Sequence, residues 1–399
     1  MRIGEARRFC TFASGGGVRG AVAAGLYFKI GGSTAFFRVH LSQLRLRDFR
    51  NYGRLDLEFS PGFHLLLGQN AQGKTNILEA IYLLGTLRSF RGVASAQMVR
   101  HGRPGFFVSG QTHHAGPHEI KMYWSPKERN LTVDARPVRK LSEFIGVFRA
   151  VVFCSEDIHL VNGTASRRRR YLDLLLSQSY PTYLPLLQRY TRALRSRNAL
   201  LKSRVIDPAS FEAFTAELVS AGTNLIEQRR KLLPQISPLA CEAYCRITNA
   251  AEELRMEYAP AVRADFLVEL RKIEARERAA RMSLIGPHRD ELVLTLDGKS
   301  AAQFGSEGQK RSVVIALKMA QAEYLTDLHG SPPVLLIDDI MGELDVRRRS
   351  GFLPLLKRVH ESQSQVFMTC TEESWPKELG RDLRRWEVKG GKVFAEAQK

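Results

Sequence analysis

Hydrophobic and polar positions along the chain follow two different periods, and these divide it into regions. Between residues 39 and 59 apolar side chains recur at every second position, as in "VHLSQLRLRDF" and "LDLEF", which predicts two strands with one buried face. The segment 292–299, with a turn signal at Asp297-Gly298, and the segment 384–394, a closing hairpin, also predict β structure. Shorter runs that are apolar almost throughout, the pattern of strands buried on both faces, occupy residues 63–67, 151–154, 333–339 and 365–370.

Helical spacing dominates the middle of the chain, from residue 166 to about residue 254 and again from 265 to 282. No strand pattern interrupts the first of these stretches, and prolines are expected to mark its helix boundaries. The prolines are Pro181, Pro208, Pro234 and Pro238. We therefore expect an all-helical arm of two or three long hairpins, inserted at 166–282 into an α/β domain.

A phosphate-binding loop is predicted where "GQNAQGKTN" follows the apolar run "FHLLL". The sequence matches G-x-x-x-x-G-K-S/T and precedes a helical pattern, which is the context that this motif requires. Gly68 and Gly73 let backbone N–H groups turn toward phosphates, and the following helix adds its positive end. Lys74 is placed to reach the β- and γ-oxygens, and the Thr75 hydroxyl to hold Mg²⁺. The predicted nucleotide-binding residues are Gly68, Gln69, Asn70, Ala71, Gln72, Gly73, Lys74, Thr75 and Asn76.

The apolar run at 333–339 ends in two carboxylates, Asp338 and Asp339. A strand that delivers an acid to the edge of a sheet is how phosphate-loop enzymes hold Mg²⁺, a role that fits Asp338. Asp339, one residue on, fits a general base for the attacking water. Taken alone, two such acids are equally expected at a solvated strand end, but the phosphate loop favours catalysis. The catalytic candidates are thus Lys74, Asp338 and Asp339, and the candidate Mg²⁺ ligands are Thr75 and Asp338.

The distance between these motifs in the sequence predicts how the domain is organised. Lys74 and Asp338 must act on the same Mg²⁺-bound nucleotide, so we expect their strands to be neighbours in one sheet. The helical arm between them is then excluded from the nucleotide core, which predicts one ATPase domain written in two halves, 38–165 and 283–399. Residues 1–37 are rich in Gly and Ala but lack the continuous apolar centre of a secretory signal, so we expect a disordered N-terminal extension.

A second helix N-terminus suited to phosphate is predicted at "SEGQKR", where Ser306 is a natural N-cap for a helix over 306–328. On its own the segment is an ordinary capped helix. Its place shortly before "LLIDD" and "GELD" favours a functional role. Because the chain already has one phosphate loop, this second terminus is best used by a neighbouring subunit. Its candidate phosphate-facing residues are Ser306, Gly308, Gln309 and Lys310.

The charge balance points to a polyanionic partner. The chain of 399 residues carries a formal net charge of +19, which favours nucleic acid or an acidic membrane surface. No apolar stretch approaches the ~20 residues that would span a bilayer, so membrane contact is disfavoured. An odd number of scattered cysteines, five in all, favours a reducing, cytoplasmic location.

Clustered arginines at the start of the helical region suggest where that partner binds. They include four consecutive arginines and a stripe that steps by three along the next helix. Sequence-independent duplex binding needs such phosphate contacts, and no ladder of aromatic residues favours stacking on single strands. A solvated basic face is the plainer alternative. The arginines are Arg167, Arg168, Arg169, Arg170, Arg189, Arg192 and Arg195.

Taken together, the motifs resemble those of the RecF family, bacterial replication and repair proteins with the ABC-type ATPase head of SMC proteins. The resemblance covers about Val39 to Phe394. The matching segments, in chain order, are "LRLRDFRNY" (44–52), "GQNAQGKTNILEAIYLLG" (68–85), "RSFRG" (88–92), "SRRRRYLD" (166–173), "GPHRDEL" (286–292), "SEGQKRS" (306–312) and "LLIDDIMGELD" (335–345).

The resemblance implies an ATP-dependent homodimer that sandwiches each ATP between the phosphate loop of one copy and the 306–310 segment of the other. It places Ser306, Gly308, Gln309 and Asp345 at the dimer seam, and it brings Arg91 near phosphate or DNA. The family clamps double-stranded DNA, favours gap junctions, and works with RecR and RecO to load recombinase. Slow, DNA-stimulated hydrolysis of ATP resets the clamp.

Two departures and two alternatives remain at this stage. SMC heads carry Glu where this chain has Asp339, and the switch histidine of transporter ATPases is replaced by Thr369 or Thr371, which leaves water activation open. The nucleotide-binding subunit of a membrane transporter shares the motifs but needs neither the arm nor the charge. A P-loop kinase or nuclease would need further metal ligands, and "GPHRD" offers only His288 and Asp290.

Overall fold

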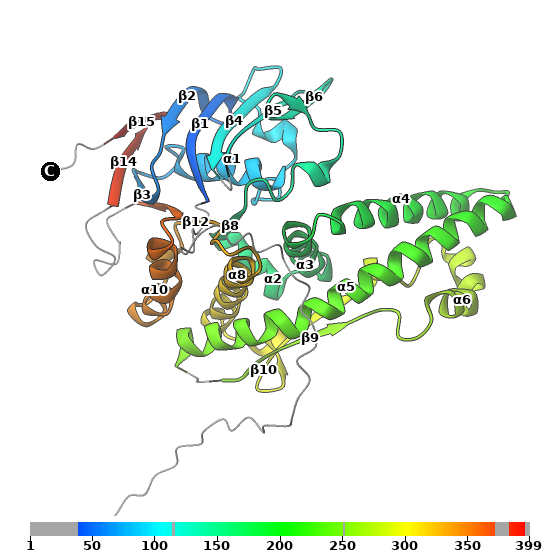
Figure 1. Cartoon of the computed structure of the whole chain (residues 1–399). Helices are drawn as coiled ribbons and strands as arrows, with labels where there is room; N and C mark the ends of the chain where they lie inside the picture. Colours follow the sequence, from blue (N-terminus) through cyan, green and yellow to red (C-terminus); the bar gives the residue numbers. More distant parts are fainter. Residues whose placement is uncertain (1–38, 114–115, 250–251, 372–382, 396–399) are drawn as a thin grey trace, which may run out of the picture. The chain divides into compact units, whose positions relative to one another are not determined.

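The structure, a computed structural model, describes residues 39–113, 116–249, 252–371 and 383–395. The expected extension at 1–37 lies outside these residues. The fold is α/β, as predicted, with two six-stranded sheets, a small antiparallel sheet and a set of long helices (Figure 1). No helix in the described part of the chain is both long and apolar enough to cross a membrane.

The first sheet is antiparallel and has the strand order β2-β1-β4-β5-β6-β7. Its leading strands bury alternate residues, because Leu44 and Leu46 face the core while Arg45 is exposed. The sequence analysis assigned no strands between residues 106 and 137, although Ile120 and Met122 alternate with polar neighbours. The strands are β1 (His40–Phe49), β2 (Tyr52–Glu58), β4 (Phe106–His113), β5 (Pro117–Trp124), β6 (Arg129–Val133) and β7 (Arg136–Pro137).

The second sheet has the order β15-β14-β3-β13-β12-β8, and all but β15 run parallel. Its strands come from both sides of the long helical region, β3 and β8 before it and β12 to β15 after it. The expectation that the strands of the phosphate loop and of Asp338 are neighbours was wrong, because β13 lies between β3 and β12. The strands are β3 (Gly62–Leu67), β8 (Ala150–Cys154), β12 (Val334–Asp338), β13 (Gln365–Cys370), β14 (Leu383–Lys389) and β15 (Lys392–Ala395).

The parallel strands separate two cores. Helix α1 (Lys74–Thr86) packs between the sheets, and its apolar residues share a core with Leu66 and Val152. The alternate residues Leu65 and Val151 face the other core, which the helices fill. This explains why these strands are apolar almost throughout in the sequence.

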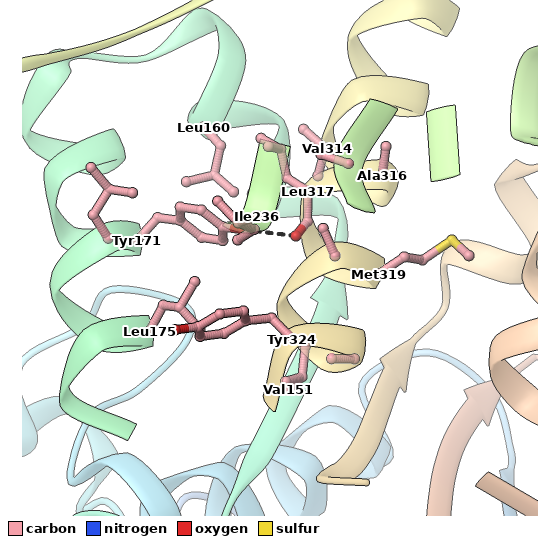
Figure 2. Close-up of a cluster of buried hydrophobic side chains, with 14 of the residues drawn as sticks. Val151, Leu160, Tyr171, Leu175, Ile236, Val314, Ala316, Leu317, Met319 and Tyr324 are labelled. Atoms are coloured by element: carbon pink, nitrogen blue, oxygen red, sulfur yellow. Dashed lines mark hydrogen bonds between the residues drawn. The ribbon is translucent and has the colours of Figure 1, made fainter. Parts of the chain in front are cut away.

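The second core is centred on α8, which is buried along most of its length. Figure 2 shows side chains of α8 meeting Tyr171 and Leu175 of α3, Ile236 of α5 and Val151 of β8. The Tyr171 hydroxyl donates to the carbonyl of Leu317 at 2.8 Å. The α-helices besides α1 are α2 (His159–Asn162), α3 (Ala165–Ser179), α4 (Tyr183–Lys202), α5 (Pro208–Thr248), α6 (Phe266–Ala280), α7 (Ala301–Phe304), α8 (Glu307–His329), α9 (Ile340–Glu343) and α10 (Val346–Glu361). Short 3₁₀ helices are η1 (Ser95–Met98), η2 (Leu141–Glu143), η3 (Ser155–Ile158) and η4 (Pro287–Arg289).

The inserted region is not all-helical, which corrects the prediction for 166–282. Strand β9 (Leu254–Ala259) pairs antiparallel with β10 (Glu291–Leu296), which also pairs with β11 (Lys299–Ser300). The alternation of apolar Leu254, Met256 and Tyr258 with polar residues carried this signal.

The prolines expected to end helices are also partly misassigned. Pro234 and Pro238 lie inside the 41-residue helix α5. An interior proline removes a helix hydrogen bond at a cost of ~3 kcal/mol. Both rings are exposed, and burial of Leu232 and Ile236 on the other face compensates. The helix is long because it packs along α4 and along α8 as well.

Candidate functional site

The predicted phosphate loop lies between β3 and α1. Gly68 and Gly73 both have positive φ, at 152° and 116°. A Cβ at Gly68 would lie 2.3 Å from the carbonyl oxygen of Val388, so the loop needs glycine there. Lys74 Nζ donates to the carbonyls of Gly68 and Gln69, at 2.5 and 2.9 Å, so the ammonium caps the loop from within.

Asn51 and Tyr52, from the turn between β1 and β2, hold the loop from its other side. The Asn51 side chain donates to the carbonyl of Gln72 at 3.0 Å and accepts from Asn76 at 2.8 Å. The hydroxyl of Tyr52 is buried, and a Cβ at Gly73 would lie 2.6 Å from it. The motif "LRLRDFRNY" flagged this turn, but sequence reasoning assigned Asn51 and Tyr52 no contact with the loop.

The two halves of the predicted site meet at Asp338. The Thr75 hydroxyl donates to Asp338 Oδ1 at 2.9 Å, and the Thr369 hydroxyl donates to the same oxygen at 2.8 Å. Thr75 reaches across β13 because it stands on α1, which crosses the strand ends, rather than on β3. Burial raises the pKa of Asp338, and these two hydrogen bonds oppose the shift. The sequence offered Thr369 or Thr371 at the place of the switch histidine. Thr369 is the one that contacts Asp338, while Thr371 is exposed outside the strand.

Asp339 begins the segment that leads from β12 into α9. Its φ is +56°, a left-handed conformation, and its side chain is exposed. Its backbone N–H donates to the Thr369 hydroxyl at 3.0 Å. Thr369 thus contacts both acids of the strand and fixes the path of the chain between them.

Burial lowers the pKa of Lys74, and Asp339 and Asp338 oppose that shift. The lysine and the two acids therefore share one electrostatic environment at the carboxyl edge of the sheet, where loop and acids were expected to meet.

The segment 306–310 is a capped helix N-terminus. The Gln309 N–H donates to Ser306 Oγ at 3.2 Å, and Gln309 Oε1 accepts from the Ser306 N–H at 2.6 Å, which is a capping box. Gln309 also donates to Glu252 at 2.7 Å. Ser306 is exposed, while Gly308, Gln309 and Lys310 are half-buried.

Asp345 caps the neighbouring helix. It accepts from the Arg348 N–H at 2.8 Å and pairs with the Arg348 guanidinium. Arg348 in turn donates to Ser312 at 2.9 Å, and a Cβ at Gly308 would lie 2.8 Å from the guanidinium. The first turns of α8 and α10 therefore lie together, with Arg348 in contact with both Asp345 and Gly308.

The four consecutive arginines separate into two pairs. Arg168 pairs with Glu291 at 2.6 Å, and Arg169 donates to the carbonyl of Asp290 at 2.7 Å. Arg167 and Arg170 are exposed. Four arginines in a row on a helix point in successive directions about 100° apart, so they cannot all face one partner. The prediction of DNA contact is therefore not retained for Arg168 and Arg169.

The stripe on α4 is partly neutralised. Arg189 pairs with Glu217 of α5 at 2.8 Å, on the surface. Arg192 and Arg195 are exposed, as predicted, while Arg197, which continues the basic run, is buried and pairs with Glu277 at 2.6 Å.

The segment "GPHRDEL" has a structural role rather than a metal-binding one. Asp290 accepts from Arg229 at 2.8 Å and from the backbone N–H of Ala261 at 2.9 Å, and it also bonds the Tyr258 hydroxyl. Arg229 bonds Asp173 of α3 at 2.8 Å as well. These contacts fasten α3, α5 and β9 together. Among the described residues, no group of three or more His, Cys, Asp or Glu is arranged to hold a metal ion.

Comparison with known proteins agrees with this geometry. The family described as RecF/RecN/SMC N terminal domain matches residues 40–386. DNA replication and repair protein RecF of Cyanothece sp. is 36% identical over 379 residues, covering 89% of this chain and 98% of the relative. The RecF protein of Geobacter sulfurreducens is 38% identical over 347 residues, covering 84% and 94%.

Solved structures give the same result. The recombination mediator protein RecF of the RecFOR pathway, solved with ATP, has a TM-score of 0.82 and 29% identity over 92% of this chain and all of that chain. An Smc head domain from Pyrococcus furiosus, 16% identical with a TM-score of 0.54 over 90% of this chain and 97% of its own, shares the fold. The chain therefore belongs to the RecF family of DNA replication and repair proteins, within the wider RecF/RecN/SMC group.

Proposed function

We propose that the chain binds ATP with Mg²⁺, pairs through ATP with a second copy of itself, and holds double-stranded DNA while the pair is closed. The observation that carries the proposal is the contact of Thr75 with Asp338, which joins the phosphate loop to the acid strand at 2.9 Å. A solved RecF structure that contains ATP supports ATP as the nucleotide. The transporter alternative is set aside because the relatives are DNA replication and repair proteins.

The donor set fits Mg²⁺. A hydroxyl and a carboxylate oxygen are the ligands that this cation prefers, and with few protein ligands it takes the rest from phosphate and water. Thr75 and Asp338 would hold it, and when bound it would neutralise charge on the β- and γ-phosphates. Lys74 would exchange its loop carbonyls for phosphate oxygens. Asp339 would polarise the attacking water, with Thr369 as its positioning residue.

The 306–310 segment completes the site of the second copy. Ser306 already caps its own helix, so the remaining N–H groups of the first turn point outward with the positive end of the α8 dipole. Ser306, Gly308, Gln309 and Lys310 would face the γ-phosphate of the partner, and Asp345 would lie at the seam. Slow hydrolysis would then open the pair and release DNA.

We place this activity in recombinational repair and replication-fork maintenance. RecR and RecO are the expected partners, because the matched RecF structures belong to the RecFOR pathway. On gapped DNA the closed pair would mark the junction at which recombinase is loaded onto the single strand.

Light scattering with and without ATP tests the proposal. The wild type should double its mass with ATP, and Lys74→Met should stay single and fail to bind ATP. Ser306→Arg should bind ATP normally and stay single, because the change blocks only the face offered to the partner. A Lys74→Met protein that still forms a dimer when ATP is added would refute the mechanism. So would a wild type whose mass does not change with ATP and whose ATPase rate does not change with duplex DNA.

A further inference from the structure

Five arginines from three separate elements gather near the carboxyl end of α1, and we call them the arginine cluster. Arg88 and Arg91 follow α1, Arg129 begins β6, and Arg167 and Arg170 lie in the first turns of α3. The guanidinium of Arg167 lies against the loop after α1, because a Cβ at Gly92 would be 3.4 Å from its Nη1. All five residues are exposed. Arg88 and Arg129 were not singled out by the sequence.

In the part of the chain that the structure describes, the arginine cluster has no carboxylate partner. Within the described residues, none of its five guanidinium groups lies within ion-pair distance of a carboxylate. None of them donates a hydrogen bond to another described side chain. This contrasts with Arg168 and Arg169, which are used within the fold.

Like charges crowd one another at this place. Partial desolvation, and then the guanidinium of Arg88, lower the pKa of Arg129. Desolvation, and then Arg88, lower the pKa of Arg170, Tyr82 opposes the shift, and Arg167 adds to it. Repulsion of this kind works against folding and is relieved when an anion binds between the charges.

The loop that carries Arg88 and Arg91 is held in place in spite of this repulsion. Glu79, fully buried on α1, accepts from Arg50 at 2.7 and 2.8 Å and also bonds the Ser89 hydroxyl. Ser89 in turn accepts the N–H of Arg91 at 3.1 Å. The loop that carries Arg88 and Arg91 is therefore tied to the helix that begins at the phosphate loop.

We infer that the arginine cluster is the surface on which the phosphate backbone of double-stranded DNA lies. This inference rests on the proposed function. It puts the DNA at the carboxyl end of α1 rather than along α4. A guanidinium group can donate two parallel hydrogen bonds to one phosphate, and arginines presented together by three elements suit a polyanion of fixed shape. The aromatic residue of the loop, Phe90, is half-buried against Tyr82, so no exposed ring there invites stacking of single-stranded bases.

The test is the salt dependence of duplex binding, measured by fluorescence anisotropy with a blunt 30-base-pair duplex and a slowly hydrolysed ATP analogue. Arg88→Ala, Arg129→Ala and the double variant should each bind more weakly. The slope of log K against log salt should fall by about 0.9 for each phosphate contact removed. Arg230→Ala, an exposed arginine of α5 without an ion pair in the described chain, is the matched control and should leave slope and affinity unchanged.

Two further measurements separate the possible failures. ATP-dependent pairing should be normal in all variants, and their thermal stability should be equal to or above that of wild type because repulsion is relieved. A wild type that does not bind duplex DNA would contradict the proposed function itself. If the wild type binds duplex DNA and the cluster variants keep the same salt slope and affinity, only this inference is overturned. The arginine cluster would then be assigned to binding an acidic protein surface.

Discussion

At the scale of single residues, burial decides what an ionisable side chain does. The sequence showed four adjacent arginines and one motif with a histidine and an aspartate, but not which of these were internal. Arg167 and Arg170 are three apart and share a face, whereas Arg168 pairs with the carboxylate of Glu291 and Arg169 donates to the backbone carbonyl of Asp290. Periodicity cannot foresee such pairs, because a polar residue in the core looks like a break in the pattern.

Asp290 should matter for stability rather than for nucleotide binding. It is buried and receives Arg229, Tyr258 and the N–H of Ala261. Asp290→Ala leaves Arg229 partly uncompensated, and breaking a buried pair in this way costs about 3–5 kcal/mol. Urea denaturation should show this loss in the free energy of unfolding. The matched variant Glu253→Ala removes an exposed partner of Arg255 and should cost less than about 1 kcal/mol, so equal losses would contradict the assignment.

His64 should make stability depend on pH. Its Nδ1 accepts from the Trp386 indole at 3.1 Å and its Nε2–H donates to the Ser60 carbonyl at 2.8 Å, so the neutral ring is held. Burial lowers the pKa of His64 to about 4, against 6.5 for the ordinary group. Above pH 6.5 both states are neutral, and between 6.5 and 4 only the unfolded state takes up the proton. Stability from this residue is therefore present above pH 6.5 and lost as the pH falls toward 4.

The size of that effect can be isolated with His64→Gln. Over pH 6 to 4.5 the free energy of unfolding of wild type should fall more steeply than that of the variant, by about 1.4 kcal/mol per pH unit. His288 and His329, whose pKa values burial also lowers to about 4, titrate in both proteins and cancel from the difference. Parallel curves for the two proteins would show that His64 does not carry the dependence.

At the scale of elements, the sequence predicted the kinds of strand better than their order. Strand β3 before the phosphate loop, strand β12 before Asp339 and the hairpin of β14 and β15 were predicted because their apolar runs and turn residues are local signals. The place of β13 between β3 and β12 was missed, since strand order depends on contacts between distant segments. The helix α1 makes up for the intervening strand, because it carries Thr75 across β13 to Asp338. Strand β9 was missed because its alternating run is short and lies between long helical patterns.

The intervening strand explains why Thr369 belongs to the site. Parallel pairing brings the end of β13 level with the end of β12, with Thr369 opposite Asp338. Thr369→Val keeps the shape of the side chain and removes both hydrogen bonds to the acid segment. We expect the steady-state ATPase rate to fall by about tenfold, or ~1.4 kcal/mol, which is within the net contribution of two such hydrogen bonds.

The affinity for ATP serves as the internal control for this variant, since Lys74 and the loop glycines are untouched. It should change by less than about threefold in an equilibrium titration. Thr369→Ser, which keeps the hydroxyl, should restore most of the rate. A rate that stays at the wild-type level in Thr369→Val would remove this residue from the mechanism.

At the scale of the whole molecule, the two helix N-termini that we propose to face phosphate lie on different elements. The terminus of α1 is enclosed by the phosphate loop, and that of α8 is capped and exposed at Ser306. Both helix starts could be predicted from the sequence, because a loop motif and a capping box are written in consecutive residues. Sequence reasoning could not locate the arginine cluster, whose members come from three elements that only the fold brings together.

Substitution of Asp339 tests how dimer formation, ATP hydrolysis and DNA release are linked. Asp339 follows the buried Asp338, its backbone is left-handed, and its N–H donates to the Thr369 hydroxyl. Asp339→Asn therefore keeps the shape of the segment but removes the base that we propose. ATP should still bind, because Lys74, Thr75 and Asp338 are intact, and the pair should close but fail to reopen. Light scattering should then find a lasting dimer with ATP, and duplex DNA should dissociate at least tenfold more slowly than from wild type. In Lys74→Met neither the dimer nor tight DNA binding should form. If Asp339→Asn hydrolysed ATP at the wild-type rate, the water would be activated by another group; if it lost the dimer, closure rather than reopening would depend on this acid.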